Sequence, residues 1–475
     1  RRPPRSTPLF SSAASDVYKR QALLHDVPVE LKQPDGSTLH CYASGDEYYS
    51  RLHDQNDYTI TQSNEDGFYY YALLQNQEIV PSIYRADQNY NLAQLGFRKK
   101  VMIPQERYLE IRERWWNGVE TRDAPTTGTV NNLNVFIRFA DEDEFGNARS
   151  YYDSYFNNEN GPSMKHYFSE VSYDMLTVNT IHYPISSMDS NLSYQDQYPR
   201  SYYQPYNAVT NPEGYTDSDR TDREHTLLQN AIAFIESEVP DSLIIDSNND
   251  GNVDNVTFLV YGVPGGWADL LWPHRWALYS VVSEIHGKRV WDYNFNMASG
   301  PYFSVGTLAH EFCHSLGAPD LYHYYNESAP VAVGGWDVMD ASTDIPQWMS
   351  SYIKYRYFNW IELQDASGGG TFELNPLGQP DNNAYRLNSS NPNEYFIIEY
   401  RTQEGMYDSN APGIDSGIVI YRVNDLYNGQ GNAQGPPDEL YVYRVGGTSN
   451  TTLSLIHISE PTRPLYISYA VFCLK

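Results

Sequence analysis

The stretch His310-Glu-Phe-Cys-His-Ser-Leu-Gly-Ala-Pro-Asp320 decides how the middle of this chain folds. Residues 304–317 (SVGTLAHEFCHSLG) have the composition of a helix, in which His310 and His314 lie on one face, one turn apart. The opposite side gathers apolar side chains, namely Val305, Leu308, Ala309, Phe312 and Leu316. The pattern therefore predicts a helix that packs on a core and presents two imidazoles on its other face.

The residues after this helix supply a third metal ligand. Gly317 suits a C-terminal cap, and Pro319 prevents the helix from continuing, so the chain must turn back. Asp320 then stands where the pattern H-E-x-x-H-x-x-G-x-x-H has its third ligand. A catalytic zinc site uses three protein ligands and leaves one position for water. We therefore predict a zinc site formed by His310, His314 and Asp320.

Glu311, next to the first ligand, is predicted to be the general base. It is placed to take a proton from a water activated by the zinc and to pass it to the leaving amine. Two alternatives stay open: a zinc site of another class with Glu327 or Asp337 as third ligand, and an adhesion or glycan-binding protein with a vestigial site. Glu311 argues against the second alternative, because a binding module needs no general base.

The motif resembles that of a known family. Residues 310–322 (HEFCHSLGAPDLY) resemble the zinc motif of the immune inhibitor A family (metallopeptidase family six), a metzincin group with aspartate as third ligand. Residues 334–340 (GGWDVMD) resemble its Met-turn, with Met339 beneath the metal, and residues 346–356 resemble the closing helix of its catalytic domain. The resemblance implies a secreted zinc endopeptidase that is made as a zymogen and cleaves extracellular proteins or peptides.

The wider pattern indicates an α+β chain of several parts. Short strand-like runs separated by turns precede residue 88, helical patterns cover 104–120 and 222–238, and strands are predicted at 134–139, 255–261, 395–400 and 417–422. With the resemblance, this predicts a metzincin-like domain flanked by a β-rich propeptide and a C-terminal β-sandwich-like domain. The expected boundaries are 22–125 (propeptide-like region and linker helix), 126–362 (catalytic domain) and 363–453 (C-terminal domain).

Both ends differ in style from the rest of the chain. Residues 1–21 are basic in an otherwise acidic chain, and residues 454–475 break from the Tyr- and Asn-rich sequence before them. Both stretches resemble translated sequencing-adapter read-through, and we expect them to be extraneous; natural disordered termini are the alternative. On either interpretation the native start, with any signal peptide, would be missing.

Composition excludes several classes of partner. The chain has 32 basic and 60 acidic residues, a net charge of -28, which opposes binding to nucleic acid or anionic membranes. No apolar run approaches the ~20 residues needed to span a bilayer. The three cysteines cannot form a disulfide framework.

An acidic loop is a candidate calcium site. Asp246, Asn248, Asp250 and Asp254 place oxygen side chains around Gly251, as Ca²⁺ requires. The loop departs from the EF-hand pattern at its twelfth position, which is Thr257. We expect a structural calcium ion, with a solvated acidic turn as the alternative.

Cys41 raises the question of a thiolate that blocks the zinc until the propeptide is removed. Leu39, Cys41 and Ala43 alternate as one face of a strand, which favours a buried, inert thiol. Cys313 is expected to pack on the apolar side of the zinc helix.

Overall fold

The computed structural model contains three main sheets and seven α-helices among the residues it describes. The described residues are 24–46, 48–116, 124–264, 270–325, 329–412, 416–444, 456–457 and 465–468. Residues 1–21 and Cys473 lie outside them, and so does most of the stretch 454–475. In the described part of the chain, no helix combines the length and apolar character that crossing a bilayer requires.

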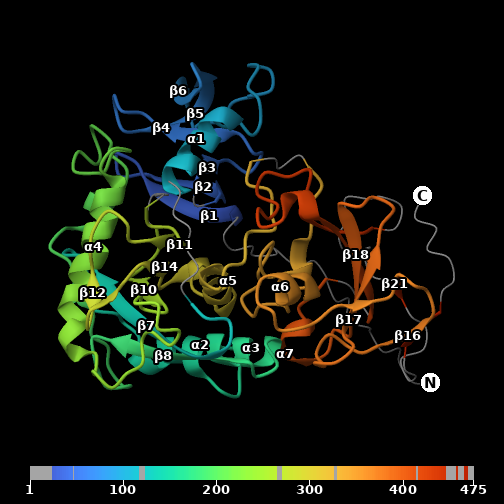
Figure 1. Cartoon of the computed structure of the whole chain (residues 1–475). Coiled ribbons are helices and arrows are strands. Elements are labelled where there is room, and N and C mark those ends of the chain that lie inside the picture. Colours follow the sequence, from blue (N-terminus) through green and yellow to red (C-terminus); the bar gives the residue numbers. More distant parts are fainter. Residues whose placement is uncertain are drawn as a thin grey trace, which may run out of the picture.

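The N-terminal unit is an antiparallel meander with one helix, shown in blue in Figure 1. Its six strands follow one another in sheet order: β1 (Leu24–Lys32), β2 (Thr38–Gly45), β3 (Ser50–His53), β4 (Thr59–Gln62), β5 (Tyr69–Gln75) and β6 (Glu78–Arg85). Helix α1 (Gln105–Trp116) comes next in the chain. The sheet has an apolar core of its own, which agrees with the predicted β-rich unit.

The second sheet forms the centre of the molecule. Its strand order is β11-β14-β10-β7-β8, and only the edge strand β11 runs antiparallel to its neighbour. The strands are β7 (Gly128–Arg138), β8 (Leu176–Tyr183), β10 (Val256–Val260), β11 (His274–Ala277) and β14 (Asp292–Met297). The short strand β9 (Tyr194–Gln195) pairs with the end of β7.

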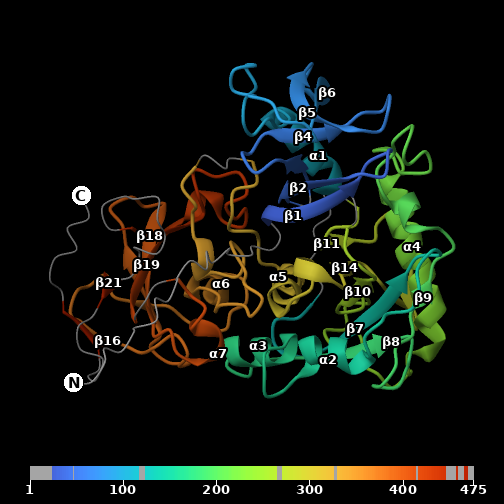
Figure 2. The same cartoon turned by 180° about the vertical axis from the view of Figure 1, so that it is seen from behind.

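Helices cover both faces of this sheet. Along β7, Val135 and Ile137 share a core with the helix α4 (Arg220–Ile235), whereas Phe136 belongs to the core on the opposite face. On that opposite face lie α2 (Arg149–Asn157), α3 (Met164–Val171) and α5 (Val305–Ser315). Figure 2 shows α2 and α3 below α5, with α4 beyond β7.

The third sheet has the order β15-β17-β18-β19-β20, with β21 also paired to β19. Its strands are β15 (Gln364–Asp365), β17 (Ala384–Asn388), β18 (Glu394–Arg401), β19 (Gly417–Asn424), β20 (Leu440–Val442) and β21 (Ile456–His457). A separate two-stranded sheet joins β16 (Thr371–Leu374) to β22 (Leu465–Ser468). Strands β21 and β22 both lie within residues 454–475, the stretch that we expected to be extraneous.

The predicted boundary at residue 362 separates two sheets but not two cores. Ile397, Val419 and Tyr421 of the third sheet belong to the same buried apolar cluster as Leu308 and Phe312 of α5. The other face of the third sheet packs on a smaller cluster with Leu374 of β16. The C-terminal strands are therefore packed on the same core as helix α5.

The helix predicted over residues 346–356 is shorter than expected. Helix α6 spans Ser351–Arg356, because the side chain of Ser350 caps it by accepting a hydrogen bond from Ile353 N. The preceding segment is held in another conformation by Gln347, whose amide donates to the carbonyls of Asp337 and Ala341. These contacts with the chain around Met339 therefore keep residues 346–350 out of the helix that the resemblance implied.

Candidate metal centre

Helix α5 is fixed on the second sheet by both polar and apolar contacts. Ser304 caps its start at Val305, because the serine hydroxyl accepts a hydrogen bond from Thr307 N at 3.1 Å. On the sheet side, the amide of Asn294 in β14 donates to the carbonyl of Glu311 at 3.0 Å and to the hydroxyl of Ser315 at 3.1 Å. Because these groups are buried, the hydrogen bonds fix the rotation of the helix and thus the direction of His310 and His314.

The helix ends as the sequence predicts. Gly317 has φ +98°, a left-handed conformation that favours glycine, and Ala318 N donates to the carbonyl of Cys313 at 3.0 Å. The chain then turns back toward the two histidines. Asp320, 5% exposed, is brought against both imidazoles.

Three ligand atoms form a nearly equilateral triangle. The two Nε2 atoms of His310 and His314 lie 3.2 Å apart, and Asp320 Oδ1 lies 3.2 Å from the first and 3.3 Å from the second. Zinc bonds of about 2.05 Å in tetrahedral geometry place ligand atoms about 3.3 Å apart. Among the described residues, His310, His314 and Asp320 are the His, Cys, Asp and Glu side chains that lie close enough together, as a group of three, to hold a metal ion.

The hydrogen bonds around the triangle orient each ligand. His310 Nδ1 donates to the carbonyl of Val338 at 2.9 Å, and His314 Nδ1 donates to that of Ala318 at 2.8 Å. A carbonyl can only accept, so each Nδ1 carries the proton and each Nε2 is left to bind a metal. The second oxygen of Asp320 accepts from the hydroxyl of Tyr324. The residues therefore fit zinc in number and geometry, and the bonds from Nδ1 direct each Nε2 toward the metal.

Charge and burial set the pKa values at the site. Burial favours neutral His310, but the hydrogen bond and charge of Asp320 and the charge of Glu311 outweigh it and raise the pKa of His310 to about 9. For Asp320, burial is likewise outweighed by His314 and His310, so its pKa lies well below the usual range. Burial raises the pKa of Glu311, and the charges of the two histidines offset this rise only in part. Glu311 Oε1 is buried and accepts no hydrogen bond from the residues described.

The sequence did not identify the groups that orient the ligands. Val338 and Ala318 act through their backbone, which leaves no signal in residue type. Tyr324 follows Asp320 by four residues, and a tyrosine in a chain with 43 tyrosines is not conspicuous.

Met339 is fully buried directly after Val338, and its carbonyl accepts from Leu321 N at 2.9 Å. The predicted Met-turn segment therefore contacts both the zinc helix and the segment of the third ligand. Of the alternative third ligands, Asp337 lies outside the triangle, and its carboxylate accepts from Met339 N and Ser350 N. Glu327 lies outside the described residues.

The acidic loop is not gathered into a comparable group. Asp246 accepts from the ammonium of Lys288 at 2.6 Å and from Asp250 N and Gly251 N. Asp254 accepts from Ser247 N, and burial, with the charges of Asp246 and Asp250, raises the pKa of Asp254 to about 6. Asn248 donates to Asp250 at 2.8 Å. Backbone amides, one lysine and the side chain of Asn248 thus supply the partners of these carboxylates.

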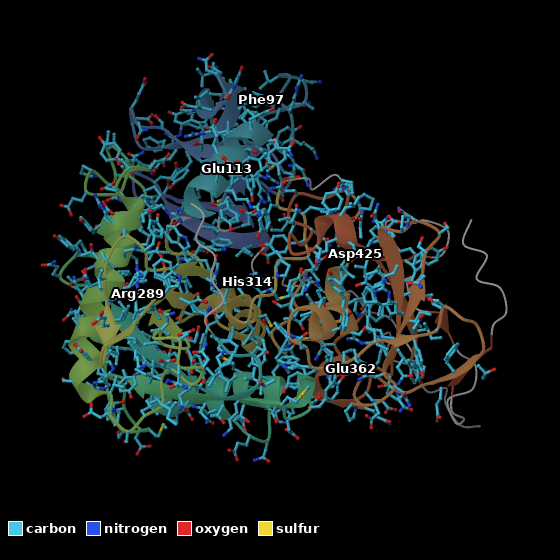
Figure 3. The ribbon with its side chains drawn as sticks, in the orientation of Figure 1. Phe97, Glu113, Arg289, His314, Glu362 and Asp425 are labelled. Atoms are coloured by element: carbon cyan, nitrogen blue, oxygen red, sulfur yellow. The ribbon has the colours of Figure 1, made fainter. Side chains whose placement is uncertain are left out.

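The N-terminal unit contacts the segment of the third ligand. The ring of Tyr324 lies 5.2 Å from that of Tyr48 and 6.4 Å from that of Tyr108, and Arg112 of α1 lies 5.3 Å above it. Tyr108 also donates to the buried carboxylate of Asp46 at 2.8 Å. Burial and, more weakly, the charge of Asp320 raise the pKa of Asp46 to about 7. Figure 3 shows His314 on the central helix, below this unit.

Both described cysteines are packing residues, as predicted. Cys41 is 3% exposed in the core of the N-terminal sheet, and burial raises the pKa of its thiol to about 12. Cys313 is fully buried among the apolar core residues that pack on α5. Neither belongs to the group of ligand atoms.

Comparisons with known proteins add little. No family model matches the chain, and no curated protein matches it. Among solved structures, wild-type OgpA from Akkermansia muciniphila is 10% identical, over 66% of this chain and 92% of that one, with a TM-score of 0.24. The catalytically inactive OgpA in complex with an O-glycopeptide (glycodrosocin) substrate gives the same values. A likeness this weak supports neither a common fold nor a common function.

Proposed function

We propose that this chain is a secreted zinc-dependent endopeptidase of the immune inhibitor A type, which hydrolyses peptide bonds in extracellular proteins. The observation that carries the proposal is the triangle formed by His310 Nε2, His314 Nε2 and Asp320 Oδ1, with sides of 3.2 to 3.3 Å. Its sides match a tetrahedral zinc site, and the general base Glu311 stands next to the first ligand.

The residues of the chain have separate roles in this proposal. Zinc, when bound, would polarise the scissile carbonyl and increase the acidity of the attacking water. Glu311 takes the proton of that water at its unpartnered Oε1 and delivers it to the leaving nitrogen. The carbonyls of Val338 and Ala318 keep the imidazoles in the tautomer that binds metal.

The proposal includes latency. The N-terminal unit places Tyr48, Tyr108 and Arg112 against Tyr324, which binds the third ligand directly. In this arrangement the side chain of His310 is fully buried, and the side chain of His314 is 16% exposed. A substrate chain would need space on this side of the ligand triangle, so removal of residues before about 125 should increase activity.

Metal analysis combined with a protease assay tests the proposal. Purified protein should contain one zinc per chain, and after limited proteolysis it should cleave casein, with the activity lost in a zinc chelator and restored by zinc. Glu311→Gln should keep the zinc and lose at least about 100-fold in kcat. Glu284→Gln, at an exposed strand residue, is the matched control.

Two results would contradict this function. A folded, processed sample without zinc affinity would exclude the metal centre. A Glu311→Gln variant that binds zinc and cleaves as fast as the control would exclude the general base. Zinc binding without hydrolysis by the wild-type protein after limited proteolysis would favour the alternative of an adhesion or glycan-binding protein with a vestigial site.

A further inference from the structure

The third ligand stands on irregular backbone, unlike the two histidines. Asp320 lies in a segment to which no helix or strand is assigned, after the end of α5. Such a segment has no hydrogen-bond ladder of its own, so its position depends on what it packs against. The structure provides that support from the loop of residues 428–439, which precedes β20 in the third sheet.

This loop binds the backbone of the ligand segment at successive residues. Asn432 N donates to the carbonyl of Asp320 at 2.9 Å, and Asn432 Nδ2 donates to that of Leu321 at 2.8 Å. Tyr324 N donates to the carbonyl of Ala433 at 3.1 Å. The loop therefore fixes both Asp320 and the residue that orients its carboxylate.

The approach of the two backbones requires a glycine. A Cβ at Gly431 would lie 2.2 Å from the carbonyl oxygen of Asp320 and 2.8 Å from Pro319 Cβ, closer than real contacts allow. Gly431 also has φ +63°, which favours glycine. A side chain here would displace the carbonyl of the third ligand.

The loop is itself rigidly held. Asn432 exchanges two hydrogen bonds with Leu440, from Nδ2 to its carbonyl at 2.7 Å and from its amide to Oδ1 at 3.0 Å. Glu439 accepts from Gln430 N and Gly431 N, and His323 Nε2 forms a hydrogen bond with Asp438 Oδ1 at 2.6 Å. Because all these groups belong to the loop, to β20 or to the ligand segment, the third sheet and the ligand segment form one rigid element.

We propose that the 428–439 loop positions the third zinc ligand, with Asn432 and Gly431 as positioning residues. This inference rests on the proposed zinc centre. Groups that orient a ligand without touching the metal typically contribute 10- to 100-fold to metal affinity. Asn432 occupies that role through the backbone of Asp320 and Leu321.

The test uses the full chain and measures zinc affinity by competition with a chromophoric chelator. Asn432→Ala and Gly431→Ala should each weaken zinc binding by about 10- to 100-fold. Both should also change the visible absorption of the cobalt-substituted protein, which reports ligand geometry. Asn424→Ala is the matched control, because Asn424 is a buried asparagine of the same sheet that accepts from Leu426 N and makes no hydrogen bond to the ligand segment.

Unfolding of the chelated proteins separates positioning from folding. Asn432→Ala and Gly431→Ala should lose more zinc affinity than Asn424→Ala does at a comparable loss of stability. Gly431→Ala, which deletes no hydrogen-bonding side chain, serves where Asn432→Ala does not fold. Wild-type zinc affinity and an unchanged cobalt spectrum in both variants would overturn the inference while leaving the zinc centre intact. Absence of zinc binding in the wild type would instead overturn the proposed function.

Discussion

Replacing Tyr324 with phenylalanine removes one hydroxyl that donates to the carboxylate of Asp320 and leaves the ring in place. The ring still contacts Tyr48 and Tyr108 of the N-terminal unit, so packing should change little. The second oxygen of Asp320 then loses its tyrosine donor in a buried site, where this carboxylate is 5% exposed. The variant therefore tests the contribution of the hydroxyl to the metal centre.

The magnitude follows from the charge of the acceptor. A hydrogen bond to a charged group contributes about 1.5 to 3 kcal/mol, which corresponds to roughly 10- to 150-fold in a binding constant. Tyr324→Phe should therefore weaken zinc binding by this factor. The range overlaps the 10- to 100-fold that orienting groups contribute in other metal sites.

Tyr325→Phe is the matched control on the next residue. Its hydroxyl donates to the carbonyl of Ile103 at 2.9 Å, a neutral acceptor before α1. Zinc affinity should be unchanged in this variant. Basal hydrolysis by the unprocessed chain should rise by about 2- to 12-fold, because the lost bond helps to hold the N-terminal unit in the latent arrangement and a neutral hydrogen bond contributes about 0.5 to 1.5 kcal/mol. Equal zinc affinities for Tyr324→Phe and wild type would refute the reasoning. So would an equal loss in both variants.

Two further predictions concern pH and calcium. Zinc binds the neutral imidazole, and the pKa of His310 is raised to about 9 without the metal, so zinc must displace a proton at neutral pH. Raising the pH removes this proton, and the zinc dissociation constant should therefore fall by about tenfold per pH unit from pH 6 to 8; a chelator competition without this slope would contradict the shift. Calcium at millimolar concentration should raise the melting temperature through the acidic loop, and more so in Lys288→Met, because the ammonium beside Asp246 competes with the ion. No shift in either protein would favour the solvated turn.

Periodicity within one element was enough to predict the helix that carries the two histidines and one strand of the central sheet. The helix predicted over 304–317 is α5 (Val305–Ser315), and the strand predicted over 255–261 is β10 (Val256–Val260). Both signals arise from residues within a few positions of one another. The convergence of Asp320 with the two histidines was also predictable, because a glycine cap and a proline fix the turn between them.

The arrangement of these elements could not be read from periodicity. Strand β14 lies between β10 and β11. Residues 292–296 (DYNFN) alternate polar and aromatic side chains, a pattern typical of a strand with one solvated face, yet the strand is buried along its whole length. The polar residues of this strand have structural roles, such as the bond from Asn294 to the carbonyl of Glu311. Such a role depends on which strand packs beneath α5, and strand order is a property of the whole sheet.

The predicted boundary at residue 362 also shows that local sequence patterns do not reveal contacts between distant parts of the chain. Strand patterns change there, so a division into a catalytic and a C-terminal domain is the natural prediction. In the structure, Asn432 binds the backbone of Asp320 and Leu321 from 111 residues beyond Leu321, and no local pattern relates such distant positions. Local sequence can supply the donor atoms of a metal site, but it cannot hold an irregular ligand segment at the required 3.2 to 3.3 Å from its partners. That precision comes from a second rigid element, and here the element is the third sheet.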